Sequence, residues 1–278
     1  MSAPRKLRAA LVQTCATDDR DANLLRIERL LRSCRGADLI VLPEVFAQRG
    51  SDELYRRAAE PLRRGALARW LGDLARRHRA WILGGSVLER AGRRIYNTSV
   101  LVDRAGRQAA TYRKMHLFEA HLENGQVVRE RDVYAAGARP VLAATAGWRC
   151  GLAICYDIRF PELFRWYAAR GAELLLLPSN FTQRTGRDHW EILVRARAIE
   201  NQCFVLAANQ CGPNPATGIR SHGHSLAVGP WGEVLAAAGD EETVLRVDLD
   251  HSALARIRRR IPALAHRHGR LTPGPRGA

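Results

Sequence analysis

The sequence predicts an α/β fold built as a single domain. Short apolar runs typical of buried strands alternate with segments whose apolar residues recur at helical spacing. No Ser/Gly-rich linker divides the 278 residues, and one α/β domain of this length is ordinary. An internal echo adds a third observation, because "GADLIVLPEVF" at 36–46 resembles "GAELLLLPSNF" at 171–181. Either any two helix–strand units look alike, or the chain repeats a layout of two facing sheets with helices outside.

The spacing of apolar residues predicts the first two strands and the helix between them. Residues 7–14 read as a strand, and residues 21–37 as a helix that ends at Gly36. The run "DLIVLPE" at 38–44 is almost continuously apolar, which predicts a strand buried on both faces.

The next helical pattern covers 52–79, and we expect Pro61 and Gly65 to break it. Later helices are predicted over 161–170 and 187–201. Further strands are predicted over 80–89, 95–103, 148–155, 173–179, 203–210, 224–230 and 243–249. The last residues, rich in Gly and Pro, predict a flexible tail over 266–278.

The composition is strongly basic, with a formal net charge of +16. A basic chain can bind nucleic acid, but here the arginines are spread over many amphipathic segments, which favours solvated helix faces. Only the segment 255–270 concentrates basic residues in one place. No run approaches the ~18 apolar residues of a membrane span, so we expect no membrane partner.

The six cysteines form no C-x-x-C pair, which argues against a zinc site. The first residues lack the apolar core of a secretory signal, so we expect a cytoplasmic protein with reduced thiols.

Cys155 is the cysteine whose position suggests chemistry. It follows an apolar strand and precedes Pro161, which suits the first turn of a helix. A turn of this kind exposes a side chain at the edge of a sheet, and a helix N-terminus or a nearby cation lowers a thiol pKa. Cys155 is therefore either a nucleophile or, as lone cysteines more often are, a buried structural residue.

Glu44 and Lys114 are its potential partners. Glu44 ends another buried strand, and the carboxyl ends of strands in α/β sheets share one crevice. There it serves as a proton donor and acceptor, or else it is a solvated turn residue. Lys114 is one of two lysines in an arginine-rich chain. Either the lysine is there by chance, or it belongs to a site that needs a compact ammonium group.

Together these three segments resemble a known family. Glu44 in "LPEVF", Lys114 in "YRKMHLF" and Cys155 in "GLAICYDIRFPEL" are similar to the Glu-Lys-Cys triad of the nitrilase superfamily, the carbon–nitrogen hydrolases. The similarity continues through "YNTSVLVDRAG", "HWEILVRARAIENQCFVLAANQCG" and "GHSLAVGPWGEVLA". It is strongest to the Nit-type amidases, which include omega-amidases and deaminated glutathione amidases. Tyr156 and Asp157 follow the cysteine where true nitrilases have Trp-Glu, which favours amides over nitriles.

The resemblance implies a four-layer αββα sandwich over residues 1–265, commonly assembled as a homodimer. It also implies a second glutamate between the lysine and the cysteine. Glu130 in "ERDVYAAG" is the preferred counterpart, and Glu123 in "HLENG" is its rival.

Further residues are expected to bind the substrate. We expect the backbone N–H of Tyr156 to hold the oxyanion, and the resemblance implies that Asn180 and Phe181 lie near the pocket. Asn180 and Asp188 depart from the pattern of the branch, which leaves the substrate open. Arg159 and Arg184 are the arginines expected to meet a substrate carboxylate, unless they lie free on the surface or pair with Asp157.

The implied activity is hydrolysis of a small linear carboxamide to a carboxylate and ammonia through a cysteine thioester. The expected substrates are an ω-amide of a keto or dicarboxylic acid or deaminated glutathione. No metal and no organic cofactor is expected. The alternatives are an N-carbamoyl amide hydrolase and a catalytically silent basic scaffold that binds nucleic acid.

Overall fold

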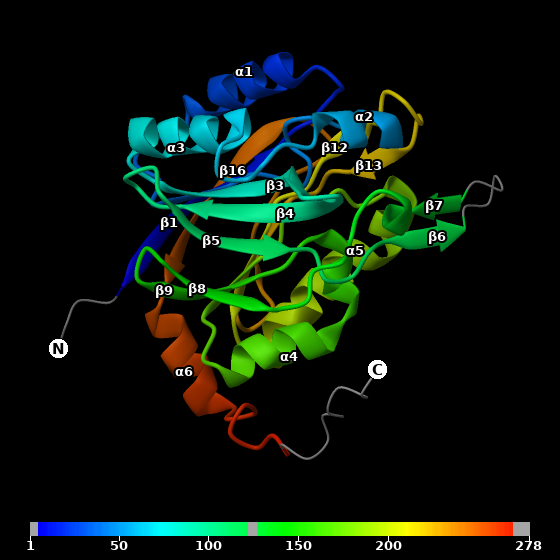
Figure 1. Ribbon diagram of the computed structural model, residues 1–278. Helices are drawn as coiled ribbons and strands as arrows, with labels where there is room; N and C mark the ends of the chain where they lie inside the picture. Colours follow the sequence, from blue (N-terminus) through cyan, green and yellow to red (C-terminus); the bar gives the residue numbers. More distant parts are fainter. Residues whose placement is uncertain (1–4, 122–126, 269–278) are drawn as a thin grey trace.

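Two six-stranded sheets form the centre of the molecule (Figure 1). The computed structural model describes residues 5–121 and 127–268. The first sheet has the spatial order β16 (Thr243–Asp250), β1 (Lys6–Gln13), β2 (Leu39–Val41), β3 (Trp81–Ala91), β4 (Arg94–Val102) and β5 (Gln108–Arg113). The second has the order β15 (Val234–Ala237), β14 (Leu226–Val228), β11 (Phe204–Ala207), β10 (Leu174–Leu176), β9 (Trp148–Leu152) and β8 (Val141–Thr145). Two further strand pairs are β6 (Glu119–His121) with β7 (Val127–Arg129), and β12 (Cys211–Pro213) with β13 (Arg220–His222).

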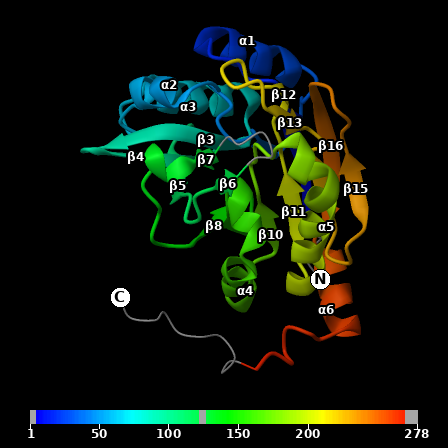
Figure 2. The ribbon, with the colours of Figure 1, turned by 90° about the vertical axis from the view of Figure 1, so that its right-hand side faces the viewer.

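The helices lie outside the two sheets. They are α1 (Arg20–Leu31), α2 (Asp52–Ala58), α3 (Ala66–His78), α4 (Pro161–Ala169), α5 (Gln183–Asn201) and α6 (Ser252–Arg260). Helices α1 and α3 contact strands of the first sheet, and α5 contacts β11 and β14 of the second. Figure 2 shows α1 and α3 on one side of the sheets and α4 and α5 on the other. The layer order is αββα, as the resemblance implied.

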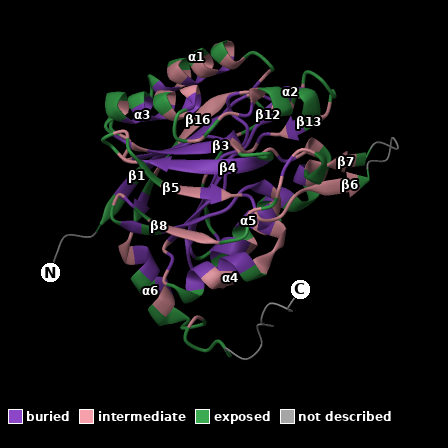
Figure 3. Cartoon of the chain, viewed as in Figure 1, coloured by how far each residue is buried: buried purple, intermediate pink, exposed green. Residues whose placement is uncertain are grey.

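Strand β2 shows why the central apolar runs are continuous. Leu39 and Val41 belong to the core that includes residues of both sheets, whereas Ile40 and Leu42 pack in the core with α1 and α3. All four side chains are buried, and Figure 3 shows the central strands as buried beneath exposed helix surfaces. A strand covered on both faces needs apolar residues at every position.

The internal echo corresponds to two equivalent structural units. Strand β2 pairs in parallel with β1 and β3, and β10 pairs in parallel with β9 and β11. Each is preceded by a glycine with positive φ, Gly36 at 82° and Gly171 at 77°. The repeated layout is therefore the correct interpretation of the echo.

Two boundary predictions have different outcomes. The expected break in the helix over 52–79 is confirmed, because α2 ends at Ala58 and α3 begins at Ala66. The prediction that the first helix continues to Gly36 is wrong, because α1 ends at Leu31. There the Ser33 hydroxyl donates to the Leu30 carbonyl at 2.9 Å, a local bond that competes with continuing the helix.

Among the residues that the structure describes, no helix combines the length and the apolar character needed to cross a membrane. Glu123 lies outside the described residues, as does the tail predicted over 266–278 except for 266–268.

Candidate active site

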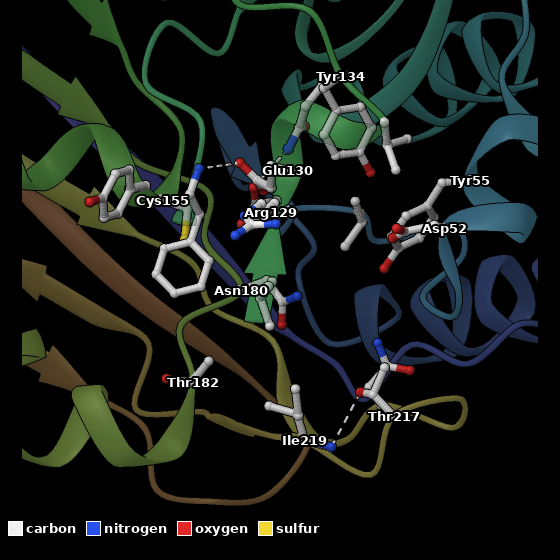
Figure 4. A pocket seen from close by; sticks show the side chains of 18 of the residues that line it. Asp52, Tyr55, Arg129, Glu130, Tyr134, Cys155, Asn180, Thr182, Thr217 and Ile219 are labelled. Carbon is white, nitrogen blue, oxygen red and sulfur yellow. Dashed lines mark hydrogen bonds between the residues drawn. The ribbon is translucent and has the colours of Figure 1, made fainter. Parts of the chain in front are cut away.

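A cavity of about 850 Å³ opens where the chain leaves β2 and β10. Residues from many separate segments line it (Figure 4). Those foreseen from the sequence are Glu44, Lys114, Glu130, Cys155, Tyr156, Arg159, Asn180 and Phe181. The volume is that of a small-molecule site.

Lys114 joins two carboxylates inside this cavity. Its Nζ donates to Glu44 Oε1 at 2.9 Å and to Glu130 Oε1 at 2.8 Å, and its side chain is 1% exposed. Glu130 Oε2 also accepts from the backbone N–H of Phe118 at 2.8 Å. Glu44 and Glu130 are thus the two carboxylates that bind Lys114 among the described residues.

Glu44 is held from several directions. Its Oε1 accepts a second hydrogen bond, from Asn97 Nδ2 at 2.8 Å, and its backbone carbonyl accepts from Gln210 Nε2 at 2.9 Å. Val45, the next residue, has a positive φ of 48°, and its N–H donates to the Ser86 hydroxyl at 3.0 Å. This sharp turn directs the Glu44 carboxylate toward Lys114 instead of solvent.

Cys155 lies just past a strand, although the strand is shorter than predicted. Strand β9 ends at Leu152, and Cys155 begins the 3₁₀ helix Cys155–Arg159 with a φ of 46°. Its N–H donates to the Pro178 carbonyl at 2.9 Å. A non-glycine residue in the left-handed region costs free energy and often marks a functional site. The turn after β9 places the thiol on the cavity wall.

Asp157 fixes this turn. Its carboxylate is fully buried and accepts from the Ile154 N–H at 2.9 Å and the Tyr112 hydroxyl at 2.7 Å. It also accepts from the His116 N–H at 3.0 Å, and its Oδ1 lies 2.7 Å from His116 Nδ1. The alternative in which Asp157 pairs with a nearby arginine is therefore wrong. Asp157 instead connects the Cys155 turn to the segment after β5 that carries Lys114.

The electrostatics keep the thiol protonated and the lysine charged. Burial and the negative charge of Glu44 raise the pKa of Cys155 well above its ordinary value, against the opposing effect of Lys114. Burial disfavours the Lys114 ammonium, but Glu130 and Glu44 together raise its pKa well above the usual value. Burial and repulsion from Glu44 raise the pKa of Glu130, which Lys114 partly offsets. Forming a thiolate here therefore requires a base.

Of three further residues singled out from the sequence, Arg159 lines the cavity, whereas Arg184 and Asp188 are not in its described lining. Arg159 lies over the Phe181 ring at 5.3 Å and the Tyr156 ring at 5.9 Å, within the cavity wall. Arg184 is exposed on α5 and is not among the described residues that line the cavity, so its position does not support a role with the substrate carboxylate. Asp188, also exposed on α5, is likewise absent from that set.

Sequence reasoning missed several residues of the site. Asn97, which holds Glu44, lies on β4 in a run of three polar residues with Thr98 and Ser99, all buried. That polar run within an apolar strand was a usable signal, because buried polar groups need partners. Arg49 and Ser221 gave no local signal, since their partners are distant in the chain.

No metal-binding group of three or more His, Cys, Asp or Glu side chains occurs within residues 5–121 and 127–268. All six cysteines are free thiols. The arrangement combines a nucleophile, a carboxylate that can move protons and a fixed cation.

Comparisons with known proteins agree with this geometry. The model of the carbon–nitrogen hydrolase family matches residues 8–259. A deaminated glutathione amidase from Yersinia enterocolitica is 38% identical over 271 residues, which is 94% of this chain and 93% of the relative. A chloroplastic omega-amidase from Arabidopsis thaliana is 36% identical over 274 residues, covering 96% and 73% of the two chains.

A similar solved structure is that of a mutant amidase from Nesterenkonia sp. AN1, with a TM-score of 0.80 and 28% identity. The similarity covers 98% of each chain. In that structure the acetamide moiety of fluoroacetamide is added covalently at the active-site cysteine.

Proposed function

This chain belongs to the carbon–nitrogen hydrolase family, and on that premise we propose that Cys155 is the nucleophile of an amidase whose substrates are small ω-amides. The protein is a hydrolase of carbon–nitrogen bonds in linear amides. One observation carries the assignment of residues: Lys114 bridges Glu44 and Glu130 in the cavity that Cys155 also lines.

In the proposed reaction, Glu44 takes the proton from the Cys155 thiol as sulfur attacks the amide carbon. The Lys114 ammonium and the backbone N–H of Tyr156 stabilise the oxyanion. The C–N bond breaks as Glu44 returns its proton to the nitrogen, which leaves as ammonia or an amine. Glu44 then removes a proton from water, whose oxygen attacks the thioester. The C–S bond breaks and the proton returns to sulfur.

Glu130 positions this machinery without reacting. It accepts a hydrogen bond from Lys114, as Glu44 does, and is itself fixed by the Phe118 N–H. The raised pKa of Cys155 supports general-base activation over a preformed thiolate.

The proposed substrates are ω-amides of keto or dicarboxylic acids and deaminated glutathione, since the similar proteins are amidases of these kinds. The cavity lining includes Arg159, which would attract a substrate carboxylate.

A panel of amides tests the assignment, with ammonia measured for primary amides and the released amine measured for N-substituted ones. We expect turnover of at least one ω-amide, and Cys155→Ala should abolish it. Cys150→Ala, at a buried cysteine of β9, is the matched control. Activity of Cys155→Ala near the wild-type rate would refute the scheme.

Release of carbon dioxide together with ammonia would instead identify an N-carbamoyl amide hydrolase. Salt-sensitive binding of nucleic acid by a protein with no hydrolytic activity would identify a basic scaffold.

We also propose that the protein forms a homodimer through an apolar patch made of Ile192, Ile199, Trp231 and Ile261. Ile192 and Ile199 are 69% and 51% exposed, and their spacing of seven residues places them on one face of α5. Ile199, Trp231 and Ile261 line a second cavity of about 620 Å³. Clustered exposed apolar side chains are typical of contact surfaces, and two-fold homodimers are the commonest assembly.

Light scattering during gel filtration tests this proposal. We expect twice the 31.0 kDa chain mass for the wild type and the single-chain mass for Ile192→Asp. Leu25→Asp, at an exposed leucine of α1, should remain dimeric. A monomeric wild type would refute the proposal.

The six free thiols, one of them the proposed nucleophile, support a reducing compartment such as the cytoplasm.

A further inference from the structure

A polar chain of three residues runs from the interior to the cavity wall. Arg49 is fully buried, and its Nη1 donates to Ser221 Oγ at 2.7 Å. Ser221 Oγ donates in turn to Asn180 Oδ1 at 2.5 Å, and Arg49 Nη1 lies 3.5 Å from the same oxygen. Asn180 and Ser221 both line the cavity.

Arg49 determines which atom donates and which accepts in the hydrogen bonds that link Arg49, Ser221 and Asn180. A guanidinium has only N–H donors, so Ser221 Oγ must accept from it and has its single hydrogen left for Asn180. The Asn180 oxygen is therefore the atom that faces Ser221 and Arg49. A flipped amide would place its NH₂ group against donor groups. The Nδ2 atom is thereby directed away from them, and no described residue accepts a hydrogen bond from it.

Asn180 lines the same cavity as Cys155, and its backbone N–H favours the Cys155 thiolate, which acts to lower the pKa of that thiol. In Figure 4 the Asn180 side chain extends from the region of Cys155 into the cavity. A donor at this place can reach the acyl chain of a substrate whose carbonyl carbon is attached to Cys155.

The positive charge of Arg49, close to Asn180, determines which substrate group binds best to the Asn180 amide. The Arg49 guanidinium makes no ion pair with a carboxylate among the described residues. Its remaining acceptors are neutral groups: the carbonyls of Ala16, Cys211, Gly212 and Pro213, and the Cys15 sulfur. An uncancelled buried cation favours an anion over a neutral acceptor nearby.

We propose that Asn180, held by Ser221 and Arg49, is a specificity-determining residue that selects amides whose acyl chain carries a carboxylate. Its Nδ2 donates to a carboxylate oxygen of the substrate, while Arg159 on the other part of the wall adds attraction at longer range. This inference rests on the proposed amidase function and deepens it by assigning recognition of the acyl carboxylate. Ser221 acts through Asn180 as a positioning residue.

Matched pairs of amides test this inference. Glutaramate and pentanamide have the same chain length and differ in a terminal carboxylate or methyl group, and succinamate and butanamide form a second pair. The readout is the ratio of kcat/KM for the acid to that for the neutral amide, measured with the intact protein. We expect the wild type to prefer the acids.

Asn180→Ala should lower this ratio by about tenfold or more, since hydrogen bonds to charged groups are strong. The loss should be larger for the acid than for the neutral amide, because only the acid offers a carboxylate oxygen to Asn180 Nδ2. Asn180→Asp keeps the shape and still accepts from Ser221, but replaces the donor with a negative charge, so its ratio should fall furthest.

Ser221→Ala frees the Asn180 amide to rotate. We expect KM to rise for the acids with little change in kcat, whereas a merely structural role would affect both members of a pair equally. An unchanged ratio in both Asn180 variants would overturn the inference and leave the amidase function standing. If the wild type hydrolysed none of these amides or other amides, the proposed function would fail first, and this inference with it.

Discussion

The segments that follow β2 and β10 have similar sequences, and we propose different roles for them. β2 is followed by Leu-Pro-Glu44-Val45-Phe46, and β10 by Leu-Pro-Ser179-Asn180-Phe181. Both phenylalanines are buried, and both segments reach the same cavity. At the end of β2 a carboxylate is held by Lys114 and Asn97. At the equivalent position after β10, the Ser179 hydroxyl donates to the nearby Leu177 carbonyl at 3.3 Å and contacts no charged group among the described residues.

If the proposed roles hold, one type of backbone unit carries chemistry after β2 and substrate recognition after β10, depending on which side chains face it. The β2 end lies against a buried ammonium, which suits proton transfer at a charged group. The β10 end lies against Arg49 and Ser221, which orient a neutral amide. Substitutions at matched positions can separate these two roles.

The largest effect is expected from Glu44→Gln. The amide keeps the size of the side chain but cannot accept the thiol proton, so kcat should fall by about 10³-fold or more. Ser179→Ala at the equivalent position should change kcat by less than about threefold. Steady-state kinetics on one good ω-amide, with thermal unfolding to confirm the fold, would make the comparison. Equal losses in the two variants would remove the distinction between the strand ends.

Lys114→Arg should lower kcat by about 10²–10³-fold, the usual loss for an oxyanion donor. The guanidinium is larger and planar, and the 1% exposed site between two carboxylates is built for a compact cation. Lys6→Arg, at the other lysine, which is exposed, is the natural control. Near-normal kinetics of Lys114→Arg would mean that the lysine has no special role.

Glu130→Gln should have a smaller effect, about 10- to 100-fold in kcat, because it removes a hydrogen bond to a charged group. The single amide oxygen can accept from Lys114 or from the Phe118 N–H but not from both, so the other donor then faces the amide NH₂ group. Glu119→Gln, on neighbouring β6, provides the control at a carboxylate that pairs with Arg129 and Arg131, both partly or fully exposed. If both variants matched the wild type, Glu130 would not position Lys114.

The smallest expected effect is on the free energy of unfolding at acidic pH. It involves His222, which contacts the segment that follows β10. The His222 N–H donates to the Phe181 carbonyl at 2.8 Å, and burial, then the neighbouring His224, lower the pKa of His222 to about 4. Asp240 opposes this shift and Arg187 adds to it. Because the unfolded chain binds the proton at pH 6.5 and the folded chain only near pH 4, stability should fall as pH drops through this window.

His222→Asn should therefore lose less stability than the wild type between pH 7 and pH 4.5, measured by urea unfolding. His121→Asn, at an exposed histidine of β6, should lose as much as the wild type. An equal pH dependence of the His222 variant and the wild type would contradict the linkage.

The fold, and the placing of Glu44 and Cys155 at the ends of strands, could be predicted because their signals are local. Continuous apolar runs mark strands such as β2, and Leu-Pro-Glu44 and the Cys155 turn each fit in a few residues. The break between α2 and α3 also follows from Pro61 and Gly65 alone. The resemblance then linked the three triad segments, which local patterns could not do.

The supporting residues could not be predicted, because their roles depend on contacts between distant segments. Ser221 meets Arg49 across 172 positions, and Gln210 meets Glu44 across 166. Helix α6 and strand β8 were also not anticipated, since neither has a long apolar run: α6 contains four arginines and β8 contains two alanines among five residues. The expected role of Arg184 with a substrate carboxylate stays a prediction, because side-chain direction on a helix depends on tertiary packing that no local pattern gives.

The most direct test of the account is mass spectrometry of the protein quenched during turnover of an ω-amide, followed by mapping of the cysteine peptides. The account predicts an acyl group on Cys155, with its level raised in a variant that attacks the amide but hydrolyses the thioester slowly. An acyl group on a different cysteine, or active turnover with Cys155 unmodified and its alanine variant still active, would contradict it.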